Sequence, residues 1–175
     1  LYINGEFWGI QNIREKVSEH FISSNHSINT EYIDLLDIQG VNEENIVHGT
    51  NTDYIELINY LETQEMNDPI VENALDNWID IESYMSYQAF QIFVDNRDWP
   101  GNNIKFWRDH RVGGKWRWIL YDTDFGFGIW DQYAYTFNTL SFALDPNGPG
   151  WPNPPWSTFV FRKLMENENF QNTFI

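Results

Sequence analysis

Cysteine is absent from this sequence, and its absence excludes disulfide bonds, thiolate metal sites and a cysteine nucleophile. Long hydrophobic runs are absent as well, so the sequence predicts no membrane-spanning helix, and it carries no signal-peptide pattern. Internal repeats and low-complexity linkers are also lacking. These absences leave a non-repetitive globular domain as the class of protein to consider.

Basic residues are scarce, because ten Lys and Arg stand against 26 Asp and Glu, for a formal net charge of −16. Such a surface would repel a nucleic-acid backbone, so we expect no nucleic-acid partner. An acidic surface suits metal ions, basic peptides or simply solubility. The four histidines lack metal-ligand spacing to one another, and we assign no catalytic histidine.

Aromatic residues are abundant by contrast. They make up 18% of the 175 residues and include nine Trp, and hydrophobic residues make up 42%. A core of this size cannot hide every Trp, so some should line a groove. The length fits one domain over residues 1–175. Because the sequence opens on strand-like residues and stops in mid-pattern at Phe174-Ile175, we expect a fragment of a longer protein, truncated at its N-terminus, with C-terminal truncation left open.

Turn signals and hydrophobic spacing predict an α+β fold. Asn4-Gly5, between β-forming residues, predicts a hairpin whose second strand runs to Arg14 or Lys16. A short helix is expected at 18–22, and residues 23–50 are expected to be polar and irregular, with a brief apolar patch at Ile33–Ile38. Beyond them the sequence predicts helices that begin at Asn51, Pro69 and Asp80, strands at 104–108 and 115–121, and a helix at 156–165. The helix over 81–93 is nearly apolar all round, so it should be central and buried.

An acidic loop follows the second of the later strands. Asp122 and Asp124 are separated by one residue, and Gly126 and Gly128 come shortly after. Two carboxylates at a strand end can reach one hard cation, because Mg²⁺ prefers oxygen ligands, and glycines let the backbone approach a ligand. A capped turn is the alternative interpretation of the same residues.

A second polar loop precedes the hairpin. In it Asp98 lies five residues before Asn103, and the hairpin separates both from Asp122. Protein kinases use an Asp to orient the attacking hydroxyl and an Asn five residues later to hold metal. They then use an Asp beyond a further hairpin for the metal that bridges the phosphates. Asp124-Phe125-Gly126 also has the spelling of the kinase Asp-Phe-Gly motif. The alternative for Asp98 is a turn residue before Pro100.

Four stretches of the chain together closely resemble the CotH family, and the resemblance extends from residue 1 to about residue 128. They are Tyr2-Ile-Asn-Gly-Glu-Phe-Trp-Gly-Ile10, Arg14-Glu-Lys16, Asp98-Trp-Pro-Gly-Asn-Asn-Ile-Lys-Phe-Trp-Arg108 and Trp116-Arg-Trp-Ile-Leu-Tyr-Asp-Thr-Asp-Phe-Gly126. CotH proteins are spore-coat and secreted-protein kinases with an atypical kinase-like fold. The resemblance therefore implies this fold and a spore-coat or extracytoplasmic location.

The family also implies ATP with Mg²⁺ or Mn²⁺ as cofactors, and Ser or Thr of partner proteins as acceptors. By position, Asp98 resembles the catalytic Asp of the family, Asn103 its metal-binding Asn, and Asp122 with Asp124 its metal-binding pair. The chain departs from the family at one place, because many members carry His-Asn where this chain has Asn102-Asn103. A kinase also needs a phosphate-covering strand pair, and only the Asn4-Gly5 hairpin is available for it here.

Few cations are available to bind phosphate. Arg14 and Lys16 end the predicted second strand, where alternation places both on one face and Glu15 on the other, and either could clamp the α- and β-phosphates. The choice between them stays open, and an ordinary surface cluster is the alternative. Five more cations on the later hairpin are expected to form a solvated face, namely Lys105, Arg108, Arg111, Lys115 and Arg117.

The sequence thus favours an ATP- and metal-dependent phosphotransferase, and two alternatives stay open. A degenerate kinase-like module could bind glycans or a coat partner through its aromatic, acidic surface. A metal-dependent glycosyl or nucleotidyl transferase also uses Asp-x-Asp, although no parallel βαβ pattern accompanies it here. The sequence does not predict an oligomeric state.

Overall fold

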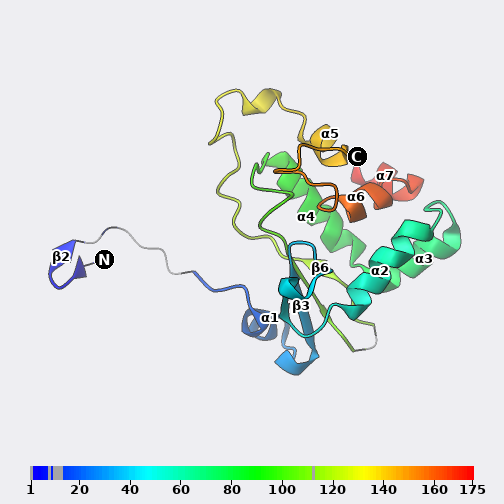
Figure 1. Cartoon of the computed structure of the whole chain (residues 1–175), viewed down its shortest axis with the longest axis horizontal. Coiled ribbons are helices and arrows are strands. Elements are labelled where there is room, and N and C mark those ends of the chain that lie inside the picture. Colours follow the sequence, from blue (N-terminus) through cyan, green and yellow to red (C-terminus); the bar gives the residue numbers. More distant parts are fainter. Residues whose placement is uncertain (1, 8, 10–13, 112) are drawn as a thin grey trace.

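The structure, a computed structural model, describes residues 2–7, 9, 14–111 and 113–175. Within these residues it contains seven α-helices and two antiparallel sheets, which confirms the predicted α+β class (Figure 1). The helices are α1 (Glu19–His26), α2 (Thr52–Thr63), α3 (Pro69–Trp78), α4 (Ile81–Phe93), α5 (Thr139–Leu144), α6 (Phe159–Leu164) and α7 (Glu168–Phe174). None of these described helices is long and apolar enough to cross a membrane.

The strands form a hairpin and a four-stranded sheet. The hairpin pairs β1 (Tyr2–Ile3) with β2 (Glu6–Phe7), and the sheet, in the order β4-β3-β5-β6, contains β3 (Ile33–Asp37), β4 (Ile46–His48), β5 (Lys105–Asp109) and β6 (Arg117–Trp118). Asn4 and Gly5 both have positive φ, 52° and 84°, as a tight hairpin turn requires, so the predicted turn is confirmed. In Figure 1 this hairpin lies away from the rest of the chain.

The prediction for the segment after the hairpin was wrong where it can be compared. Residues 14–17 are irregular, so Arg14 and Lys16 do not end a strand, and their expected alternation with Glu15 is lost. Residues 8 and 10–13 of the predicted strand lie outside the described residues. The helix expected at 18–22 is present and extends to His26 as α1.

The central strand β3 falls in the segment that was expected to be irregular, and that prediction was wrong. β3 is covered on both faces, since Ile33, Leu35 and Leu36 are all fully buried. A strand buried on both faces shows no alternation of apolar and polar residues, and Asp34 interrupts its apolar run. Only the pairing with β5, which places Asp37 opposite Lys105, reveals the strand.

The predicted solvated face on the later hairpin was wrong for Lys105 and Arg108, whereas the side chain of Arg111 is 53% exposed. Each of the five cations meets a carboxylate, and Arg108 is almost buried, with a side chain that is 12% exposed. The pairs are Lys105 with Asp37, Arg108 with Asp34 and Asp53, Arg111 with Asp109, Lys115 with Asp76, and Arg117 with Asp80. The scarce cations are therefore used to neutralise acidic residues around the sheet.

Helix α4 runs through the middle of the molecule and leads into the Asp98 loop (Figure 1). The helix starts after Asp80, as predicted, and the Asp80 side chain accepts a hydrogen bond from the backbone N–H of Ser83. Tyr84 and Tyr87 are buried, but Phe93 at the C-terminal end is 81% exposed. The prediction of burial all round is therefore wrong for one face of the helix, where Glu82, Ser86, Ala89, Phe90 and Phe93 are exposed.

The main core lies between the sheet and the helices α2, α3, α4, α6 and α7. Helices α2 and α3 begin after Asn51 and at Pro69, as predicted. The helix expected at 156–165 is shorter, and α5 and α7 were not predicted. Both are short, and the side chains of Asn138 and Asn167 cap their N-termini.

Candidate phosphate and metal site

The loop after α4 is packed into the protein. Trp99 is 2% exposed, and a Cβ atom on Gly101 would lie 2.6 Å from the carbonyl oxygen of Pro152, so only glycine fits there. Asn96 is buried, and its Oδ1 accepts a hydrogen bond from the Asp98 backbone N–H at 3.1 Å. These contacts hold the backbone of Asp98 in one position.

Asp98 and Asn103 meet as the kinase-like spacing predicts. Asn103 Nδ2 donates to Asp98 Oδ2 at 2.7 Å, and Asn102 Nδ2 donates to the same oxygen at 3.1 Å. Asp98 Oδ1 has no hydrogen-bond partner in the described part of the chain. One carboxylate oxygen is thus fixed by two amides, and the other is left to accept a proton or a ligand.

The acidic loop lies beside the Asp98 loop. Two backbone hydrogen bonds join them: Arg97 N–H donates to the Phe125 carbonyl at 3.1 Å, and Phe127 N–H donates to the Val94 carbonyl at 2.6 Å. Gly126 is buried at this junction, and a Cβ atom there would lie 3.0 Å from the Val94 oxygen. Two loops that are separate in the sequence therefore form one surface.

Tyr121 is surrounded by carboxylates from three parts of the chain. Burial first, and then the negative charges of Asp37, Asp122 and Asp98 in that order, together raise the pKa of its phenol to about 12. A charge acts on the phenol in this way only from nearby, so Asp98 and Asp122 belong to one neighbourhood. Asp37 was not predicted to lie there.

Asp124 is set apart from this group. It is exposed, and its carboxylate has neither a hydrogen bond nor an ion pair among the residues that the structure describes. Over the same residues, no three acidic or histidine side chains come close enough together to hold a metal ion. The donors are nevertheless of the kind that Mg²⁺ and Mn²⁺ prefer, namely carboxylate and amide oxygens on loops. The structure thus joins Asp98 to Asn103 by a hydrogen bond, and Asp98 and Asp122 both act on Tyr121. The carboxylate of Asp124 has no such interaction within the described residues.

A cavity of about 450 Å³ opens beside Asp122 and Tyr121. Arg14, Lys16 and Lys105 line it, together with Asp37. Arg14 Nη1 lies 3.8 Å from Asp122 Oδ1, and its side chain is 66% exposed. Both predicted phosphate cations therefore lie at this cavity, although neither is held by a strand.

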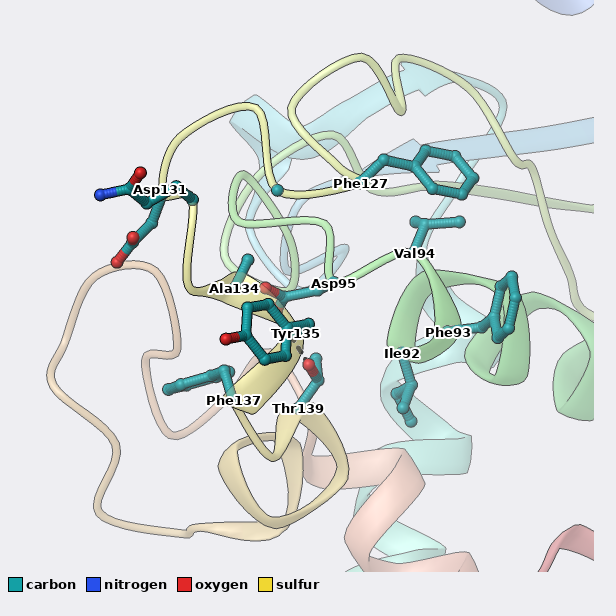
Figure 2. A pocket seen from close by; sticks show the side chains of 12 residues that line it. Ile92, Phe93, Val94, Asp95, Phe127, Asp131, Ala134, Tyr135, Phe137 and Thr139 are labelled. Atoms are coloured by element: carbon teal, nitrogen blue, oxygen red, sulfur yellow. Dashed lines mark hydrogen bonds between the residues drawn. The ribbon is translucent and has the colours of Figure 1, made fainter.

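A second cavity, of about 560 Å³, lies on the other side of the Asp98 loop, between the end of α4 and residues 127–139 (Figure 2). Asp95 points into it and accepts a hydrogen bond from Thr139 Oγ1 at 2.8 Å (Figure 2). Phe127 and Tyr135 are more than three-quarters exposed at its rim. This cavity therefore combines aromatic and aliphatic side chains with polar ones, including the carboxylates of Asp95 and Asp131.

Arg97 connects the Asp98 loop to the wall of this second cavity. Its guanidinium carbon lies 3.8 Å from the ring centre of Phe137, 4.4 Å from that of Trp130 and 4.9 Å from that of Phe142. Its Nη1 atom also lies 3.5 Å from Asp95 Oδ1. A cation that is held over aromatic faces and beside a carboxylate restrains the residue next to it, which is Asp98.

The geometry agrees with a comparison of the whole chain with known families. The family model described as "CotH kinase protein" matches residues 1–175. This chain belongs to the CotH kinase family. The resemblance seen in the sequence is thereby confirmed, and the α+β architecture is consistent with a kinase-like CotH domain. No curated protein and no solved structure matched the chain.

Three residues lie at or next to the candidate site although the sequence did not predict them there: Asp37, Lys105 and Arg97. Asp37 lies on the strand that was not predicted, so its approach to Lys105 could not be foreseen. Lys105 was assigned to a solvated face, although its place two residues after Asn103 is a signal that it lies near the site. Arg97 precedes Asp98, and kinase catalytic loops also carry an Arg in that position.

Proposed function

We propose that this CotH domain transfers the γ-phosphoryl group of ATP, with Mg²⁺ or Mn²⁺, to a Ser or Thr hydroxyl of a spore-coat or secreted protein. The observation that carries the proposal is the Asp98–Asn103 hydrogen bond of 2.7 Å, at kinase spacing, beside Asp122. Family membership supports the kinase-like class of the reaction. The acceptor and the location follow from what the family is known for.

The roles follow from the chemistry of each side chain. Asp98 would accept the proton of the attacking hydroxyl through Oδ1, since Oδ2 is engaged by two amides. Asn103, Asp122 and Asp124 would hold the divalent ions, which offset the negative charge of the phosphates when bound. Lys16 or Arg14 would contact the phosphates from the wall of the cavity.

One observation favours a second candidate function. Aromatic side chains are exposed around the second cavity, with Phe93 at 81%, Phe127 at 76% and Tyr135 at 83%. Aromatic faces can stack on sugar rings or on a partner protein. A CotH domain without turnover would then serve as a structural or glycan-binding module, and Asp98 and Asp122 would have no role in binding.

A nucleotide experiment separates the two functions. We expect ATP with Mn²⁺ to raise the melting temperature of the purified protein, and radiolabelled ATP to transfer its γ-phosphate to the protein itself or to an added acceptor. Asp98→Asn should abolish transfer and keep the nucleotide-induced stabilisation. If wild type shows neither stabilisation nor labelling, the proposal fails. Hits on a glycan array without nucleotide binding would support the second candidate instead. Stabilisation by a sugar nucleotide but not by ATP would point to a glycosyl transferase.

A further inference from the structure

Cations converge on the cavity beside Asp122. Three of the ten Lys and Arg residues line it, namely Arg14, Lys16 and Lys105, in a chain whose net charge is −16. An acidic protein gains little from gathering cations on its surface, unless they neutralise carboxylates or accept an anion. Two carboxylates of this cavity, Asp37 and Asp122, are paired with Lys105 and Arg14.

Lys105 differs from the other two cations in how firmly it is held. Its side chain is 19% exposed, whereas that of Arg14 is 66% exposed, and Arg14 and Lys16 lie in an irregular segment. Lys105 belongs to β5, directly opposite Asp37 on β3. Its carbonyl accepts a hydrogen bond from Ile119 N–H at 2.8 Å, so strands on both sides fix its backbone.

The ion pair orients the ammonium group of Lys105 but engages only one of its N–H donors. Lys105 Nζ lies 3.2 Å from Asp37 Oδ2 and donates a hydrogen bond to it. An ammonium group has three donors, so this bond leaves two for a ligand. A carboxylate-anchored lysine of this kind loses little side-chain freedom when it binds, which favours affinity.

Lys105 also lies next to the residues that would hold the metal. It follows Asn103 by two residues, and it lines one cavity with its partner Asp37 and with Asp122. A bound polyphosphate would need a cation on the side that the metal leaves uncovered. Lys105 is the cation that the sheet holds in such a place.

We propose that Lys105, oriented by Asp37, binds the phosphates of the nucleotide in this cavity. The proposal rests on the proposed function for the identity of the ligand, and it adds a binding residue to those that the sequence predicted. Arg14 and Lys16 then have a lesser part, because they lie in the irregular segment and Arg14 already faces Asp122. The competing explanation is that the Lys105–Asp37 pair only joins β3 to β5.

Lys115 provides a matched control. It lies on the same hairpin, and its Nζ donates to Asp76 Oδ1 at 2.9 Å, but it does not line the cavity. Lys105→Met and Lys115→Met thus each remove one ammonium group and break one ion pair. The affinities of both variants and of wild type for ATP with Mn²⁺ and for inorganic pyrophosphate would be measured by calorimetry.

We expect Lys105→Met to weaken the binding of ATP and of pyrophosphate by about 10- to 100-fold, as for a lost hydrogen bond to a charged group. Lys115→Met should bind as wild type does. Lys105→Arg should recover part of the affinity, and Asp37→Asn should weaken it less than Lys105→Met does, because the ammonium remains. Melting temperatures without ligand should be similar for Lys105→Met and Lys115→Met, since each loses one ion pair.

The proposal would be overturned if Lys105→Met bound both anions as tightly as wild type does, or if Lys115→Met lost as much affinity as Lys105→Met. Wild type that binds neither ATP nor pyrophosphate would also overturn it, together with the nucleotide site. If pyrophosphate binding depends on Lys105 but no phosphoryl transfer is detected, Lys105 is a phosphate-binding residue and the proposed function is wrong.

Discussion

The two loops of the candidate site differ in how firmly packing holds them. In the Asp98 loop, Trp99 is 2% exposed and Asn96 is 1% exposed, and the Asp98 carboxylate already holds two amides. In the acidic loop, the Asp122 side chain is 41% exposed and Phe127 is 76% exposed. The first loop is preorganised by packing, and the second, whose side chains are more exposed, is joined to it by two backbone hydrogen bonds.

This difference has a physical reason. A proton acceptor must be placed before the reaction, because its orientation contributes to the rate. Carboxylates that share a metal repel one another while the cation is absent. Exposing them to water therefore costs less free energy than packing them close together. We therefore expect changes in the Asp98 loop to affect turnover and stability, and changes in the acidic loop to affect metal binding.

The largest effect is expected for Asp98→Asn. The amide cannot accept the hydroxyl proton, so transfer should fall by about 100- to 10,000-fold, the usual contribution of a general base. Nucleotide binding should persist, because the loop is held by Asn96 and Trp99 and not by the carboxylate alone. Phosphate incorporation and nucleotide-induced melting shifts would be measured side by side. An unchanged rate would show that the preorganised loop is not catalytic.

Because the two loops differ in burial, substitutions in them should differ in their effect on the free energy of unfolding. Trp99→Ala should lower the free energy of unfolding by about 3–5 kcal/mol, as for other buried Trp or Phe truncations. Phe127→Ala, in the exposed loop, should change it by no more than about 0.5 kcal/mol. Urea unfolding of both variants tests the comparison. Equal losses would mean that the acidic loop is packed as firmly as the Asp98 loop.

Measurements of Mn²⁺ affinity should distinguish the contributions of Asp122 and Asp124 to metal binding. Removal of a residue that only hydrogen-bonds to a metal ligand usually weakens metal binding by about 10- to 100-fold. We expect the loss of Asp122 or Asp124, as a ligand itself, to weaken Mn²⁺ binding by at least this factor. Asp122→Asn should have the larger effect, because Asp122 shares the surroundings of Asp98, whereas Asp124 is set apart. Mn²⁺ titration by electron paramagnetic resonance would measure both affinities, with Glu62→Gln on α2 as an exposed control. A larger loss for Asp124→Asn would reverse the assignment.

The smallest effect concerns the titration of Tyr121. Its folded-state pKa is raised from 10.0 to about 12, first by burial and then by Asp37, Asp122 and Asp98. The phenol therefore contributes stability that is fully present below pH 10 and lost as the pH rises towards 12. Asp122→Asn should lower the pKa of Tyr121, which ultraviolet titration against Tyr121→Phe would detect. No change would place Asp122 away from the phenol.

Local signals in the sequence predicted the elements whose cause lies within a few residues. Asn4-Gly5 specified its turn through positive φ, Asp80 capped α4, and the five-residue step from Asp98 to Asn103 fits one loop. Such features depend on neighbours along the chain, so propensity and spacing are sufficient to find them. The CotH resemblance was carried by motifs of the same local kind.

Features that depend on distant partners escaped prediction. The bond from Lys105 to Asp37 joins residues 68 positions apart, and that from Thr139 to Asp95 joins residues 44 apart. The sequence by itself determined which residues could carry kinase-like chemistry and how they are spaced. Only the tertiary structure decided which strand pairs with β5 and which carboxylates lie near Tyr121. Such long-range pairing depends on the packing of a shared core and not on any local pattern.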